Sequence, residues 1–154
     1  MTLNALIFQI NPDKGHEDGE TYNIYDFKEA ITRGTQEWGL HGGANYKKIG
    51  IGDSVLIGHI KKTKTDSYNK WADKIVGVGK IKSIPTDIYD NFTIIIDKDL
   101  SSKLFKNPLP CNMIKDYIPK IMMNKTIIRL KFPSNTNFDS LFGIIKKHLN
   151  INIK

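Results

Sequence analysis

The chain has 154 residues, enough for one domain that buries roughly 70% of its unfolded surface without cross-links. Cys111 is the only cysteine, which excludes an intrachain disulfide and a thiolate-rich zinc cluster and favours a reducing compartment, so we expect the cytoplasm. The net charge of +7 favours polyanionic partners, although a coding sequence rich in A and T would also enrich lysine.

The first residues lack a basic region followed by a long apolar run, so we expect no signal peptide. Nor does any window approach 18 uninterrupted apolar residues, and we therefore expect no membrane span.

The N-terminal part predicts a strand followed by a helix. The apolar run over residues 3–10 ends before Asn11-Pro12, which predicts a buried strand closed by a turn. Asn23 is a suitable N-cap, and Gly34 a suitable stop, for a helix with one apolar face. That face comprises Phe27, Ala30 and Ile31.

The middle of the chain predicts strands joined by glycine-rich turns. We expect, in order, a short helical turn over residues 45–49, a turn at 50–53, and strands over 54–60, 74–83 and 91–96. Gly77 and Gly79 share one face of their strand, which indicates a close approach by another group or a barrel bend.

The C-terminal part mixes irregular and regular structure. A short helix is expected over residues 99–105, and Pro108, Pro110 and Pro119 predict an irregular segment after it. A strand over residues 126–132 and an amphipathic helix from residue 137 onward complete the chain. The lysines on and near that helix are expected to be ordinary surface residues.

This order of elements resembles the EVE domain, a member of the PUA-like group that includes the YTH readers of methylated adenine. The resemblance covers roughly the first 80 to 85 residues. It rests on residues 8–12, Trp38, Asn45, Gly52-Asp53, Val55, His59 and residues 75–81. It implies one α+β domain over residues 1–154, with a PUA-like mixed β-barrel flanked by helices, that holds a modified or flipped-out base in an aromatic cage.

Two segments depart from the EVE pattern. His41-Gly42-Gly43-Ala44-Asn45 stands where the family commonly has an Arg-Asn-rich segment, and the loop over residues 61–74 is long. EVE-like domains also occur at the N-terminus of modification-dependent, McrBC-like (type IV) restriction proteins. The resemblance therefore implies a DNA-targeting module whose partners are an AAA+ GTPase motor, in the same or a longer chain, and a nuclease.

We expect Trp38 and Trp71 to form the walls of the cage, because aromatic planes replace the stacking that a flipped base loses. The alternative for each tryptophan is core packing. Hydrogen bonds to the edge of the base would come from polar residues at the barrel mouth, which otherwise serve as turn residues, caps or satisfied polar groups. These candidates are Asn11, His41, Asn45 and His59.

A lysine-rich loop surrounds Trp71 and also holds Tyr68, and basic residues interleaved with aromatics are typical of a nucleic-acid surface. We expect these lysines to contact the phosphate backbone; the alternative is a solvated loop. They are Lys61, Lys62, Lys64, Lys70 and Lys74.

The sequence holds no convincing catalytic pattern. Cys111 has no nearby histidine, the four histidines lack metal-ligand spacing, and no Glu-X-Lys follows Asp97 and Asp99. Residues 77–80 lack P-loop spacing. We therefore expect no enzyme, no metal and no cofactor. An RNA-binding PUA-like module in RNA modification or turnover is the alternative function, and an enzyme of a related barrel family is a third.

Overall fold

The computed structural model describes residues 5–11, 22–39, 49–59, 66–86, 91–119 and 127–150. Its strands are β1 (Ala5–Ile10), β2 (Thr35–Gly39), β3 (Ser54–His59), β4 (Lys74–Ser83), β5 (Asn91–Ile96), β6 (Leu109–Pro110) and β7 (Ile127–Arg129). Its α-helices are α1 (Ile24–Arg33), α2 (Lys98–Lys106) and α3 (Phe138–His148), and its 3₁₀ helices are η2 (Asp66–Tyr68) and η3 (Cys111–Tyr117).

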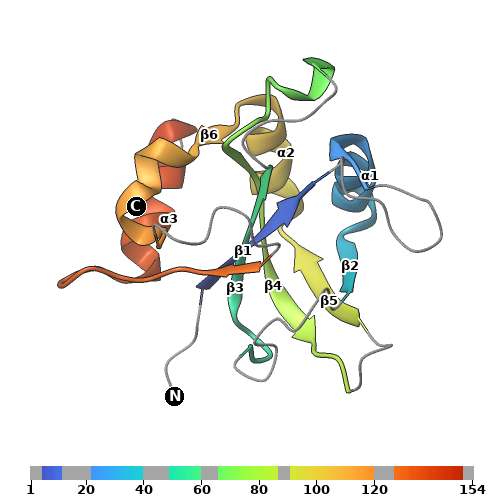
Figure 1. Cartoon of the computed structure of the whole chain (residues 1–154), viewed down its shortest axis with the longest axis horizontal. Helices are drawn as coiled ribbons and strands as arrows, with labels where there is room; N and C mark the ends of the chain where they lie inside the picture. The colour runs from blue at the N-terminus through green and yellow to red at the C-terminus, as the bar shows by residue number, and fades with distance from the viewer. Residues whose placement is uncertain are drawn as a thin grey trace.

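The strands form one mixed sheet in the order β2-β5-β4-β3-β1-β7, with β6 paired to β4 (Figure 1). β1 and β3 are parallel, and the other pairs are antiparallel. Because β1 and β3 are parallel neighbours, their carboxyl ends lie side by side, and there Ile10 pairs with His59.

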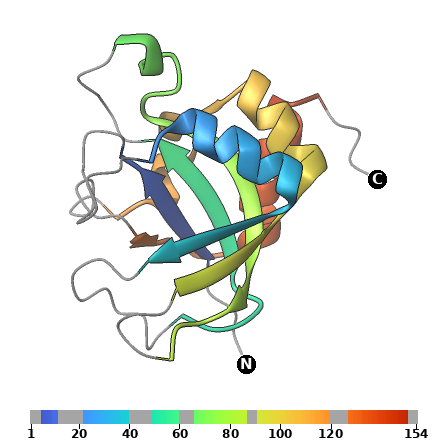
Figure 2. The ribbon, with the colours of Figure 1, turned by 90° about the vertical axis from the view of Figure 1, so that its right-hand side faces the viewer.

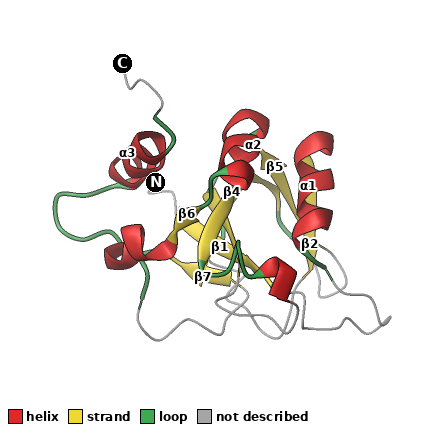
Figure 3. Cartoon of the chain, turned by 90° about the horizontal axis from the view of Figure 1, so that it is seen from above, coloured by secondary structure: helices red, strands yellow, loops and turns green. Residues whose placement is uncertain are grey.

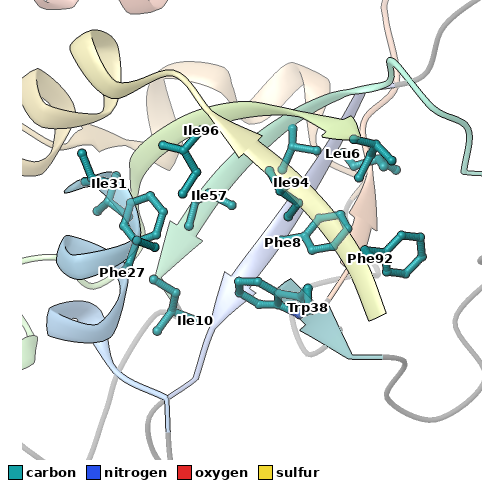
Figure 4. Close-up of a cluster of buried hydrophobic side chains, with 14 of the residues drawn as sticks. Leu6, Phe8, Ile10, Phe27, Ile31, Trp38, Ile57, Phe92, Ile94 and Ile96 are labelled. Atoms are coloured by element: carbon teal, nitrogen blue, oxygen red, sulfur yellow. The ribbon is translucent and has the colours of Figure 1, made fainter. Parts of the chain in front are cut away.

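The sheet is strongly curved, as Figure 2 shows. β1 and β2 are four strand spacings apart in the sheet order, which would separate them by about 19 Å if the sheet were flat. Yet the rings of Phe8 on β1 and Trp38 on β2 have centroids only 5.3 Å apart, and Phe8 lies 5.7 Å from Phe92 on β5 (Figure 4). The sheet therefore rolls around these rings, with the geometry expected of a PUA-like pseudo-barrel.

Alternation along the strands separates two hydrophobic clusters. Inward side chains of the curved sheet meet α1 in the first cluster, to which Leu6, Phe8, Ile10, Val55 and Ile57 belong. The alternate positions of β1 and β3 face outward and meet η3 and α3 in the second cluster, which includes Ala5, Ile7, Leu56, Ile114, Leu141 and Ile145. Figure 3 shows α3 and α1 at opposite ends of the molecule.

The signals that predicted α1 act as expected. The side chain of Asn23 accepts hydrogen bonds from the backbone N–H groups of Tyr25 and Asp26, and the Asp26 carboxylate accepts from the backbone N–H of Asn23. Gly34 ends the helix with φ of 86°, a left-handed conformation that favours glycine. The predicted apolar face, Phe27, Ala30 and Ile31, is buried.

Most of the other predicted elements are confirmed within the described residues, but three expectations differ. Trp38 lies within a strand, β2, that the sequence did not predict, because this strand follows α1 after Gly34 alone. The segment expected to be irregular contains η3. β7 ends at Arg129, before the end of the expected strand, although the N–H of Leu130 still donates to the carbonyl of Ala5 on β1. The short turn expected over residues 45–49 lies almost wholly outside the described residues.

None of the described helices is long and apolar enough to cross a membrane.

The glycines of β4 let neighbouring groups approach closely, as their pattern predicted. A Cβ at Gly77 would overlap the ring of Phe27, and one at Gly79 would overlap the backbone carbonyl of Ile95. On the same stretch of β4, the hydroxyl of Ser101 on α2 donates to the carbonyl of Val78 (3.1 Å) and accepts from its N–H (3.0 Å). β4 is thus fixed against α1, α2 and β5.

We predict that Gly77→Ala lowers the free energy of unfolding by about 1–3 kcal/mol, because the added methyl overlaps a buried ring. Gly143→Ala is the matched control, since a Cβ there meets nothing within 4 Å and alanine favours the helix by about 1 kcal/mol. Urea unfolding followed by circular dichroism measures both. Equal stability of the Gly77→Ala variant and the unmodified chain would contradict the packing described here.

Candidate nucleic-acid interface

Trp38 lies near the end of β2 and faces the interior of the curved sheet. Its ring meets Phe8 at an interplanar angle of 85° and Tyr22 at 61°, with centroids 5.3 and 5.7 Å away. Neither ring lies parallel to the indole. Trp38 is 8% exposed, so it belongs to the core cluster but is not fully enclosed.

A small polar network fixes Tyr22 beside Trp38. The hydroxyl of Tyr22 donates to Oε1 of Gln36 (2.8 Å), which also accepts from the guanidinium of Arg33 (3.3 Å). Burial raises the pKa of the Tyr22 hydroxyl, and the Asp26 carboxylate adds to that effect. Sequence reasoning missed this aromatic partner, because Tyr22 and Gln36 are 14 positions apart and carry no local signal of contact.

Trp71, the other predicted wall of the cage, is enclosed in this structure. Trp71 is 3% exposed, its indole N–H donates to the carbonyl of Phe105 (3.2 Å), and its ring lies 5.3 Å from that of Phe105. The ammonium of Lys70 lies 4.1 Å from the centre of the indole. Trp71 therefore anchors the segment before β4 to the end of α2, and its neighbours leave it enclosed.

Two polar candidates do come together at the carboxyl ends of β1 and β3. His59 ends β3 opposite Ile10, and Asn11 directly follows Ile10. His59 is 1% exposed, with its ring 6.4 Å from that of Tyr68, whereas Asn11 is half-buried. The other proposed pocket residues, His41 and Asn45, lie outside the described residues.

The structure describes two of the five lysines expected to contact phosphates, since Lys61, Lys62 and Lys64 lie outside the described residues. Lys70 is exposed above Trp71, and the ammonium of Lys74 donates to the carbonyl of Lys70 (2.8 Å). The charge of Lys70 therefore lies against the ring of Trp71, and Lys74 is held to the backbone beside it.

Two of the residues considered for catalysis, Asp97 and Asp99, make contacts within or at the start of α2. Asp97 caps α2 by accepting from the N–H of Leu100 (3.1 Å), and Asp99 pairs with Lys103 (3.3 Å). Burial raises the pKa of the Cys111 thiol to about 12, with a further contribution from Asp73. Over the residues that the structure describes, no group of three His, Cys, Asp or Glu side chains could hold a metal ion.

Comparison with solved structures finds human THYN1 protein in a crystal structure of its complex with 5-methylcytosine-containing DNA. The TM-score is 0.52 at 13% sequence identity, and the match covers 93% of this chain and 98% of that chain. The likeness therefore confirms the predicted α+β fold, a PUA-like mixed sheet flanked by helices. No family model matches the sequence, and no curated protein matches it.

We predict that native Cys111 reacts with iodoacetamide on the order of 10³-fold more slowly at about pH 8 than Cys111 in the unfolded chain. A thiol whose pKa rises from 9.0 to about 12 holds that much less thiolate. Mass spectrometry of samples quenched with and without guanidinium chloride measures both rates. Equal rates would show an accessible, ionisable thiol and reopen a nucleophilic role.

Proposed function

We propose that this chain is a DNA-binding module that recognises a modified base, such as methyladenine or methylcytosine, by flipping it against Trp38. The position of Trp38 carries the proposal: it is a core tryptophan, 8% exposed, in the interior of a fold shared, over 93% of this chain, with a protein crystallised on 5-methylcytosine-containing DNA. Stacking on an aromatic ring contributes about 1–3 kcal/mol per base, comparable to what unstacking costs.

Base selection in this proposal comes from the polar residues at the carboxyl ends of β1 and β3. Asn11 and His59 would bond the edge of the base, joined by His41 and Asn45 from the segment after β2. Because only 8% of Trp38 is exposed, a base reaches the indole only when the residues packed around it move apart. The proposal thus includes a local rearrangement on binding.

The proposed setting is a modification-dependent, McrBC-like restriction system. In that setting this domain selects the DNA, while an AAA+ GTPase motor and a nuclease supply movement and cleavage. The resemblance to EVE domains supports this, and the proposal makes the domain itself a non-enzymatic cytoplasmic reader.

We predict that Trp38→Leu weakens binding of modified DNA roughly 5- to 100-fold and removes the preference for the modified base, because leucine cannot stack. Phe142→Leu is the matched control, since Phe142 packs against the second hydrophobic cluster and lies in neither the proposed base site nor the first cluster. Fluorescence anisotropy with matched DNA oligonucleotides carrying 5-methylcytosine, N6-methyladenine or no modification measures affinity and preference.

Circular dichroism melting would confirm that both variants fold. An unchanged preference in Trp38→Leu contradicts the assignment of this site. If the unmodified chain binds the matching RNA more tightly than every DNA probe, the RNA-binding alternative replaces the DNA proposal.

We predict that Lys70→Gln lowers the slope of log affinity against log salt by about 0.7–0.9, because one phosphate contact is lost. Lys147→Gln on α3 is the control, since Lys147 is exposed and α3 lies away from α1 (Figure 1). Equal salt slopes for the two variants would contradict a phosphate contact by Lys70.

A further inference from the structure

A continuous run of ring contacts, partly buried and partly exposed, leads from the end of β3 to α2. We call it the aromatic ridge, and it comprises His59, Tyr68, Tyr25, Trp71 and Phe105. Successive ring centroids in this order are 6.4, 6.0, 5.7 and 5.3 Å apart. The ridge joins β3, η2, α1, the segment before β4 and α2, which are distant in sequence and adjacent in the fold.

The two tyrosines form the accessible part of the ridge. Tyr25 is 48% exposed, and Tyr68 is half-buried between Tyr25 and His59. Tyr25 is held in place, because its backbone N–H donates to the side chain of Asn23 (2.8 Å) and its ring meets Trp71 edge-on. A fixed, exposed ring binds a planar ligand with little loss of side-chain entropy.

Two ammonium groups lie over the buried end of the ridge. Lys70 lies 4.1 Å from the centre of the Trp71 ring, and Lys28 lies 6.0 Å from the centre of the Phe105 ring. Both lysines are exposed. The carboxylate of Asp26, next to Tyr25 in the chain, is engaged by the backbone N–H of Asn23 in the helix cap. Exposed aromatic rings beside lysines suit a polyanion whose bases stack, which is a nucleic-acid strand.

We propose that the nucleotides flanking the recognised base follow the aromatic ridge, with one base stacked on Tyr25 and the adjoining phosphates near Lys28 and Lys70. This inference rests on the proposed function, because it takes the carboxyl ends of β1 and β3 as the entry of the base. His59 lies at that point and is also the first member of the ridge. The ridge thereby supplies affinity that is independent of the modification.

The experiment compares Tyr25→Leu with Tyr25→Phe by fluorescence anisotropy. Both replacements keep an apolar side chain against Trp71, but only phenylalanine keeps a flat ring. The probes are a modified oligonucleotide with long flanks, its unmodified counterpart, and a modified oligonucleotide cut close to the modified base. We expect Tyr25→Leu to weaken binding of both long probes roughly 5- to 100-fold, and Tyr25→Phe to bind within about twofold of the unmodified chain.

The short probe separates the ridge from the base site, because it cannot reach Tyr25 and should bind the two variants equally. Lys28→Gln should reduce the salt dependence for the long probes, whereas Lys147→Gln should not. Equal binding of the long probes by Tyr25→Leu and Tyr25→Phe would overturn the ridge. A different outcome would overturn the proposed function and leave the ridge standing. In that outcome Tyr25→Leu weakens binding, but the unmodified chain binds modified and unmodified probes equally.

Discussion

The contact between Phe8 on β1 and Trp38 on β2 is the constraint on which the rest of the structure depends. The two strands are far apart in the sheet, so their rings can meet only if the intervening strands bend. The bend is compatible with the close packing at β4, where Gly77 admits the ring of Phe27 and Gly79 admits the backbone of β5. Burial of the rings at the centre stabilises the curved form.

The curved sheet has an outer face, which η3 and α3 cover, and an inner face, which holds the candidate site. η3 and α3 cover the outer face of β1 and β3 through the second hydrophobic cluster. The carboxyl ends of β1 and β3 instead lead to His59, Asn11 and the tyrosines near α1. The inner face of the sheet, which holds Trp38 in the first cluster, therefore serves both stability and the proposed recognition.

Local signals predicted the elements well, whereas contacts between distant segments escaped them. The cap at Asn23, the stop at Gly34 and the alternation within β1 and β3 act through near neighbours, so the sequence suffices to identify them. The lysines that flank Trp71 in the sequence predicted an exposed ring. The fold buries that ring against Phe105, 34 positions away, and Lys70 covers it. The sequence carries no mark of such pairings.

The central claim is that Trp38, and not Trp71, meets the base, and two-dimensional ¹H–¹⁵N NMR tests it directly. The two indole N–H signals, assigned with Trp71→Phe, would be followed as an oligonucleotide cut close to the preferred modified base, too short to reach the aromatic ridge, is added. We expect the Trp38 signal to shift strongly as the base stacks, while the Trp71 signal, bonded to the carbonyl of Phe105, moves little. A large shift of Trp71 with an unmoved Trp38, at saturating DNA, would contradict the account.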